Sequence, residues 1–175
     1  MKDYNYTDMK IKKERRELIK SYLYALPLIL LLFISIAESN DAYLDALITV
    51  PVSIENSSGY NAEFHAFLTN SHSQRQRGLM HIANLPLNKG MLFHFAPPRH
   101  VSMWMKNTLI PLSVAYISDT GEIIDIYDMV PLSKISVCSK EPALYALEVN
   151  QGWFDKNDLR SGDFINIKTL LQNDD

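Results

Sequence analysis

The stretch Gly90–Ser113, GMLFHFAPPRHVSMWMKNTLIPLS, decides how the fold of this 175-residue chain is interpreted. It holds two apolar runs, Met91–Phe95 and Val101–Lys106, separated by Ala96-Pro97-Pro98-Arg99. Because proline fixes φ and has no amide hydrogen to donate to a strand ladder, the residues between the runs predict a turn. The stretch therefore predicts a central β-hairpin that closes on a polar patch made of Lys106, Asn107 and Thr108.

Further strands are expected on both sides of this hairpin, where short β-branched or aromatic runs are bounded by turn residues. A turn at Asn56–Gly59 joins the first two of these runs, and a turn at Asp119–Gly121 joins the next two. The predicted strands are Ile48–Ile54, Ala62–Leu68, Leu112–Ser118, Glu122–Asp128, Ala143–Val149 and Asp163–Ile167.

Two short helices are expected between the strands. Ser71 followed by Gln74 has the spacing of a capping box, which opens a helix through about Arg77, and Gly78 ends it. The second helix is predicted at Gly152–Leu159. About eight short strands with two short helices indicate a mostly β (α+β) domain, either a small β-barrel or a folded-over antiparallel sheet.

The amino-terminal 37 residues predict export. Basic residues precede Ser21–Ala37, which carries no charge and ends in the small-x-small sequence Ser35-Ile36-Ala37, typical of a cleavage site. The uncharged stretch also reaches the lower end of the roughly 17–25 residues that span a bilayer. We therefore expect residues 1–37 to be a signal peptide or a membrane anchor, which places the body outside the cytoplasm, in the periplasm or secreted.

Charge and cysteine content set bounds on the body. Residues 1–37 hold 7 Lys/Arg and 4 Asp/Glu, whereas residues 38–175 hold 10 and 16, so the body is acidic. An acidic body argues against nucleic acid as a partner, because phosphate binding needs a basic surface. Cys138 is the single cysteine, so the fold depends on its core rather than on an internal disulfide. We expect a linker at 38–47, one monomeric domain at 48–170 and a tail at 171–175.

The chain carries four motifs in this order: RGLM (Arg77–Met80), GMLFHF (Gly90–Phe95), MWMKNTLIPL (Met103–Leu112) and LEVNQGW (Leu147–Trp153). Together they resemble the domain-of-unknown-function family 192 (DUF192). The resemblance covers Ile48 to Ile167 and implies a mostly β fold, but the family brings no accepted activity with it. The chain departs from the family pattern at Ser113, where an acidic residue is usual, and at His81–Ile82, where an arginine is common.

The candidate site is derived from the alternation of side chains along strands. In the second run of the central hairpin, Val101, Met103 and Met105 are expected to face the core, which leaves Trp104 and Lys106 on the other face for a cation–π contact. On Ala143–Val149 the alternate residues Tyr145, Leu147 and Val149 are expected to point inward. Glu148 then lies on the opposite face, where we expect it to be the counter-ion of Lys106 or Arg77. The candidate ligand-binding residues are Arg77, Trp104, Lys106, Asn107, Thr108 and Glu148.

Three functions stay open at this point. The preferred one is an exported domain that binds a small molecule, a peptide or an envelope component, without chemistry and without a cofactor. A hydrolase or transferase that uses Lys106 and Glu148 is the second. A periplasmic copper-handling protein is the third, because thioether and imidazole ligands suit Cu(I). The histidines of this chain show no recognised spacing of metal ligands, so no metal site is predicted. The polar patch can also simply end a strand, with Asn107 and Thr108 satisfying loop amides.

Overall fold

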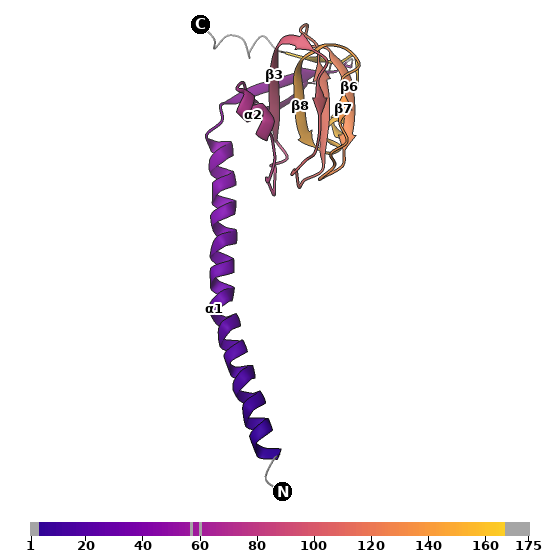
Figure 1. Cartoon of the computed structure of the whole chain (residues 1–175). Helices are drawn as coiled ribbons and strands as arrows, with labels where there is room; N and C mark the ends of the chain where they lie inside the picture. The colour runs from indigo at the N-terminus through magenta and orange to yellow at the C-terminus, as the bar shows by residue number, and fades with distance from the viewer. Residues whose placement is uncertain (1–3, 57, 60, 167–175) are drawn as a thin grey trace. The chain divides into compact units, whose positions relative to one another are not determined.

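A computed structural model describes residues 4–56, 58–59 and 61–166 of the chain (Figure 1). The predicted tail at 171–175 and the end of the predicted domain at 167–170 lie outside these residues. Contacts between residues divide the chain into two units, 1–42 and 43–175, and the second unit contains the sheet.

The first unit consists of most of helix α1 (Tyr4–Asp45). This helix continues through the residues where we expected the linker, and Leu44 and Leu47 are buried in the second unit. Among the described residues, no helix combines the length and the apolar character needed to cross a membrane.

The second unit is mostly β, as predicted, and is built on one curled, half-barrel sheet of seven strands (Figure 1). The strand order is β6-β5-β8-β3-β2-β1-β9, while β4 and β7 form a separate two-stranded ladder. The strands are β1 (Thr49–Glu55), β2 (Asn61–Thr69), β3 (Lys89–Arg99), β4 (Ser102–Met103), β5 (Leu112–Ile117), β6 (Ile123–Met129), β7 (Val137–Cys138), β8 (Ala143–Asn150) and β9 (Phe164–Ile165), with helices α2 (His72–Arg77) and α3 (Trp153–Lys156).

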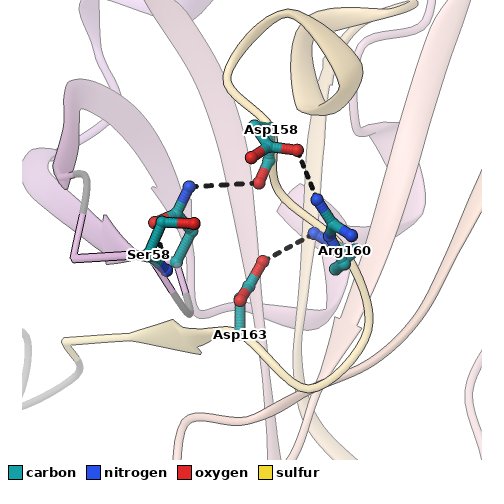
Figure 2. A network of polar contacts seen from close by, with 5 residues as sticks. Ser58, Asp158, Arg160 and Asp163 are labelled. Atoms are coloured by element: carbon teal, nitrogen blue, oxygen red, sulfur yellow. Dashed lines mark hydrogen bonds and ion pairs between the residues drawn. The ribbon is translucent and has the colours of Figure 1, made fainter.

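The curl of the sheet brings its two edges together at one end. Glu122, which precedes β6, forms a bridge with Phe164 of β9, and the Ile123 amide donates to the Asp163 carbonyl at 2.8 Å. Figure 2 shows how the loop before β9 is held: the Asp163 carboxylate accepts the Arg160 amide at 2.8 Å, and Arg160 also contacts Asp158. Asp163 therefore acts as a turn residue.

Both faces of the sheet are covered by apolar side chains. One cluster takes residues from all seven strands, including Ile123 and Ile165 at the two edges, and therefore fills the inside of the curl. The other cluster covers the opposite face with residues that include Leu79, Ile82 and Met105 from the connecting segments. A strand in the middle of this sheet is consequently buried on both faces, and all six residues of β5 are buried.

The predicted central hairpin was wrong. Strand β3 continues through Arg99, across a cis peptide bond before Pro97, and β4 pairs with β7 instead of β3. The physical reason is that both edges of β3 are already occupied, one by β2 and the other by β8. The second apolar run therefore leaves the sheet, and Val101 and Met105 are buried in the cluster on its outer face.

The sheet is antiparallel except at one place, where β2 and β3 are parallel. Parallel neighbours need a crossover connection, and α2 with the loop after it supplies one. The capping box predicted for this helix is confirmed: Ser71 Oγ accepts the Gln74 amide at 3.2 Å, and Gln74 Oε1 accepts the Ser71 amide at 3.1 Å. Gly78 ends the helix with a positive φ of 49°.

Candidate functional site

A cleft of about 230 Å³ opens between α2, the end of β3 and the segment that follows β3. Its position follows from the fold, since the crossover and the displaced apolar run cover the same face of the sheet. Glu148 of β8 is the acidic residue among those that line it, and the basic residues are His72, Arg75, Arg77 and Arg99.

The structure brings four of the six predicted site residues to this cleft, namely Arg77, Trp104, Thr108 and Glu148. Lys106 lines a neighbouring hollow of about 310 Å³, which shares Arg77 and Trp104 with the cleft. Asn107 lines neither of these two spaces. It adopts a positive φ of 59°, and its carbonyl accepts the His81 amide at 2.9 Å, so it shapes the loop beside the cleft.

Trp104 and Lys106 form the cation–π contact that strand alternation predicts. The Lys106 ammonium lies 5.3 Å from the centre of the Trp104 ring, and the Trp104 side chain is 44% exposed. This contact holds the indole at the rim, where its open area is available to a bound molecule.

Glu148 is buried at the base of the cleft, with 4% of its surface exposed. Strand alternation explains its direction, because Leu147 and Val149 belong to the cluster inside the curl and Ala146 belongs to the outer cluster. The flanking strands place Met91 and Val114 directly opposite Glu148. Loss of water around the carboxyl raises the pKa of Glu148 to about 8.

The expected counter-ion contact of Glu148 is not formed. Within the described part of the chain, its carboxyl makes no ion pair with Lys106 or Arg77. The two cations are directed at aromatic rings instead: Lys106 at Trp104, and Arg77 at Tyr43, whose ring centre lies 3.6 Å from the guanidinium carbon. An acid whose pKa is about 8 is mostly protonated at neutral pH, so the carboxyl at the base of the cleft is mostly neutral there.

Arg75 and Arg99 are functional candidates that sequence reasoning missed. Their guanidinium carbons lie 6.0 and 5.1 Å from the centre of the Phe95 ring, and Arg75 Nη1 donates to the Asn70 carbonyl at 2.7 Å. Neither arginine forms an ion pair with any described carboxylate. The capping box could have pointed to Arg75, because it fixes the start of a helix whose last turn then carries Arg75 and Arg77. Arg99 shows no comparable signal.

The fold separates the methionine and histidine side chains that a copper-handling protein would use as thioether and imidazole ligands. Met91 and Met105 are buried in the outer cluster, while Met80 and Met103 line the cleft. His94 stacks on Tyr145 with the ring centres 5.0 Å apart. The methionines thus do not face one common space, and the buried pair fills the core, as strand alternation predicts for Met105.

Cys138 lies at the surface beside Ser102, with 2.6 Å between the sulfur and the hydroxyl oxygen. Ser113 is buried, donates to the Asp128 carboxylate and accepts the Gly152 amide at 3.1 Å. Ser113 thereby links β5, β6 and the start of α3. This is a structural role at the position where the family pattern has an acidic residue.

Comparisons with known proteins cover the same region of the chain. The model of the DUF192 family, described as an uncharacterized ACR, matches residues 53–167. A crystal structure from Sinorhizobium meliloti 1021, provisionally assigned as a transcription regulator, is 35% identical; the match covers 69% of this chain and 94% of that one, with a TM-score of 0.67. A protein of unknown function from Novosphingobium aromaticivorans DSM 12444 is 29% identical over 69% of this chain and 86% of that one, with a TM-score of 0.66. No curated protein matches the chain.

The first prediction concerns Glu148→Gln and stability. The folded-state pKa of Glu148, about 8, lies above its ordinary value of 4.5, so the folded protein keeps a proton that the unfolded chain has released. The wild type should therefore lose stability as pH rises from about 5 to about 8, with no further loss above that range. Glutamine stays neutral, so the variant should gain roughly 3–5 kcal/mol over the wild type between these limits.

Urea unfolding of the full chain at a series of pH values measures this difference. The matched control is Glu63→Gln on the exposed side of β2, which should follow the wild type at every pH. A Glu148→Gln variant whose stability runs parallel to the wild type would show that the carboxyl is solvated or paired.

Proposed function

The chain belongs to the DUF192 family, and we propose that it is an exported domain that binds a small anionic molecule in the cleft without transforming it. The observation that carries this proposal is the pair of arginines at Phe95. Two guanidinium groups lie near one ring, and neither has a carboxylate partner among the described residues. Guanidinium groups bind carboxylates and phosphates through paired hydrogen bonds, so an anion fits this place.

The shape of the cleft supports a small ligand. Its volume of about 230 Å³ is below the ~300–1,000 Å³ of pockets for drug-sized molecules. Trp104 at the rim, which is 44% exposed, offers apolar area to the non-ionic part of the ligand. The body as a whole is acidic, so the arginines make a local positive site that attracts an anion against the average charge.

A second candidate function is acid–base catalysis by Glu148, because a carboxyl with a pKa of about 8 can exchange a proton near neutral pH. The enzyme considered from the sequence pairs Glu148 with Lys106, but Lys106 lines the neighbouring hollow instead of the cleft. Binding is therefore favoured. Transcription regulation, the provisional assignment of the Sinorhizobium relative, is not proposed, since DNA binding needs a basic surface and residues 38–175 carry 10 basic against 16 acidic residues.

The proposed location rests on the sequence of the amino terminus. Residues 1–37 carry the basic region, the uncharged region and the Ser35-Ile36-Ala37 site that are typical of export. The ligand would then be a molecule of the envelope or of the surroundings.

The second prediction tests this location. Residues 1–45 fused to a reporter that is active only outside the cytoplasm should give active reporter, whereas residues 38–45 fused to the same reporter should give none. Mass spectrometry of the reporter's amino terminus shows whether cleavage follows Ala37. If the longer fusion is active only after the cells are broken, the export proposal fails.

The third prediction tests anion binding. Butanoate and inorganic phosphate, titrated separately into the full chain, should each be scored by NMR shifts of amides in α2 and in residues 99–104. At least one probe should give saturable shifts there, and Arg75→Gln or Arg99→Gln should weaken its binding by about tenfold, the effect of losing one charge-assisted hydrogen bond.

Arg160→Gln is the matched control, because Arg160 is exposed and contacts Asp158 in a loop that does not line the cleft. It should bind the probes as the wild type does. Absence of saturable shifts with both probes, or an equal loss in the control, would contradict anion binding in the cleft.

A further inference from the structure

The base of the cleft carries a group that the proposed anion does not use. Glu148 is 4% exposed, lines the cleft and makes no hydrogen bond or ion pair with the residues that the structure describes. Glutamate is almost never fully buried unless it is paired. The carboxyl of Glu148 is unpartnered and directed into the cleft, so its chemistry indicates which group of a ligand would bind there.

The arginines do not supply this partner. Among the described residues, no ion pair within 4 Å joins Glu148 to Arg75 or Arg99, and burial alone accounts for the raised pKa of Glu148. The acid and the two guanidinium groups are thus separate features of one cleft. They also come from different elements, since Glu148 lies on β8, Arg75 on α2 and Arg99 at the end of β3.

We propose that the ligand is zwitterionic, an inference that rests on the proposed function. Its anionic group binds at Arg75 and Arg99, and an ammonium group of the same molecule binds the carboxyl of Glu148. A purely anionic ligand would leave Glu148 without a partner, whereas an ammonium group satisfies it with a charge-assisted hydrogen bond. On binding, the ammonium group favours the ionised carboxylate, and the proton of Glu148 passes to solvent. The small cleft volume limits the ligand to a compact molecule, such as an amino acid or a short peptide end.

The separation of the two charged features adds a condition on the ligand. More than 4 Å lies between the carboxyl of Glu148 and the guanidinium groups, so a ligand can lie between them with one charged group near each. The length of the chain between its ammonium and carboxylate groups then decides whether one molecule reaches both.

A matched series of probes tests this inference. Glycine, 3-aminopropanoate, 4-aminobutanoate and 5-aminopentanoate are each compared with acetate, propanoate, butanoate and pentanoate, which lack only the ammonium group. At least one of the four amino acids should bind the full chain about tenfold more tightly than its matched carboxylate, the effect of one charge-assisted hydrogen bond. Titration calorimetry and NMR shifts of the cleft amides measure the two affinities.

Variants assign the effect to the named groups. In Glu148→Gln the advantage of the amino acid should disappear while the carboxylate binds as before; in Arg75→Gln both probes should bind more weakly. Glu63→Gln, exposed on β2, is the matched control and should keep the advantage. Thermal melts confirm that each variant is folded.

The outcomes separate this inference from the function on which it rests. Equal binding of amino acids and carboxylates, with loss in Arg75→Gln, would overturn the zwitterion and leave anion binding in place. An advantage that survives in Glu148→Gln would overturn the role of Glu148. If neither probe series binds at the cleft, both proposals are wrong.

Discussion

A carboxyl group in the middle of a strand that is buried on both faces is the constraint on which the account of this protein depends. Strand β8 lies between β3 and β5, apolar clusters cover both sides of the sheet, and the buried side chain of Glu148 lines the cleft. The strands are also closely apposed here. A Cβ at Gly90 of β3 would lie 2.8 Å from the Glu148 carbonyl oxygen, so glycine allows this approach.

The cleft exists because of how the neighbouring strand is paired. Strand β3 is occupied on both edges, so the chain after Arg99 leaves the sheet and crosses its outer face. The crossover between β2 and β3 places the capped helix α2 on the same face. Two segments that are distant in sequence thus bring guanidinium groups to the space above Glu148. The arginines at the rim of the cleft and the carboxyl of Glu148 at its bottom are consequences of this topology.

The sequence predicted features that depend on neighbours along the chain. The capping box of α2 and the β1–β2 and β5–β6 hairpins follow from local chemistry. Of the three residues that alternation placed on the core face, Val101 and Met105 are buried, whereas Met103 is half-buried and lines the cleft. The central hairpin failed because its outcome depends on which edge of β3 is free, and distant strands decide that. An apolar segment that leaves a sheet and packs on its face shows the same alternation of apolar and polar residues as a segment that pairs with a neighbouring strand.

In the candidate site, too, the features that depend on sequence neighbours could be predicted, and those that depend on distant segments could not. Trp104 and Lys106 are two residues apart, so their contact could be predicted, and the direction of Glu148 followed from alternation along β8. The counter-ion prediction failed because aromatic rings compete for the cations, and Tyr43, the partner of Arg77, lies far away in sequence. Arg75 and Arg99 were missed because only the crossover brings them to one ring. The binding roles of the six residues predicted from sequence stay predictions.

The most direct test of the account is the titration of one atom. In the full chain, ¹³C NMR of the Glu148 side-chain carboxyl carbon, assigned by comparison with Glu148→Gln, reports the pKa of this group itself. We expect a midpoint near pH 8, because burial without a partner disfavours the charged form. A midpoint between about 4 and 5, the ordinary range of glutamate, would show a solvated or paired carboxyl and would contradict the central claim.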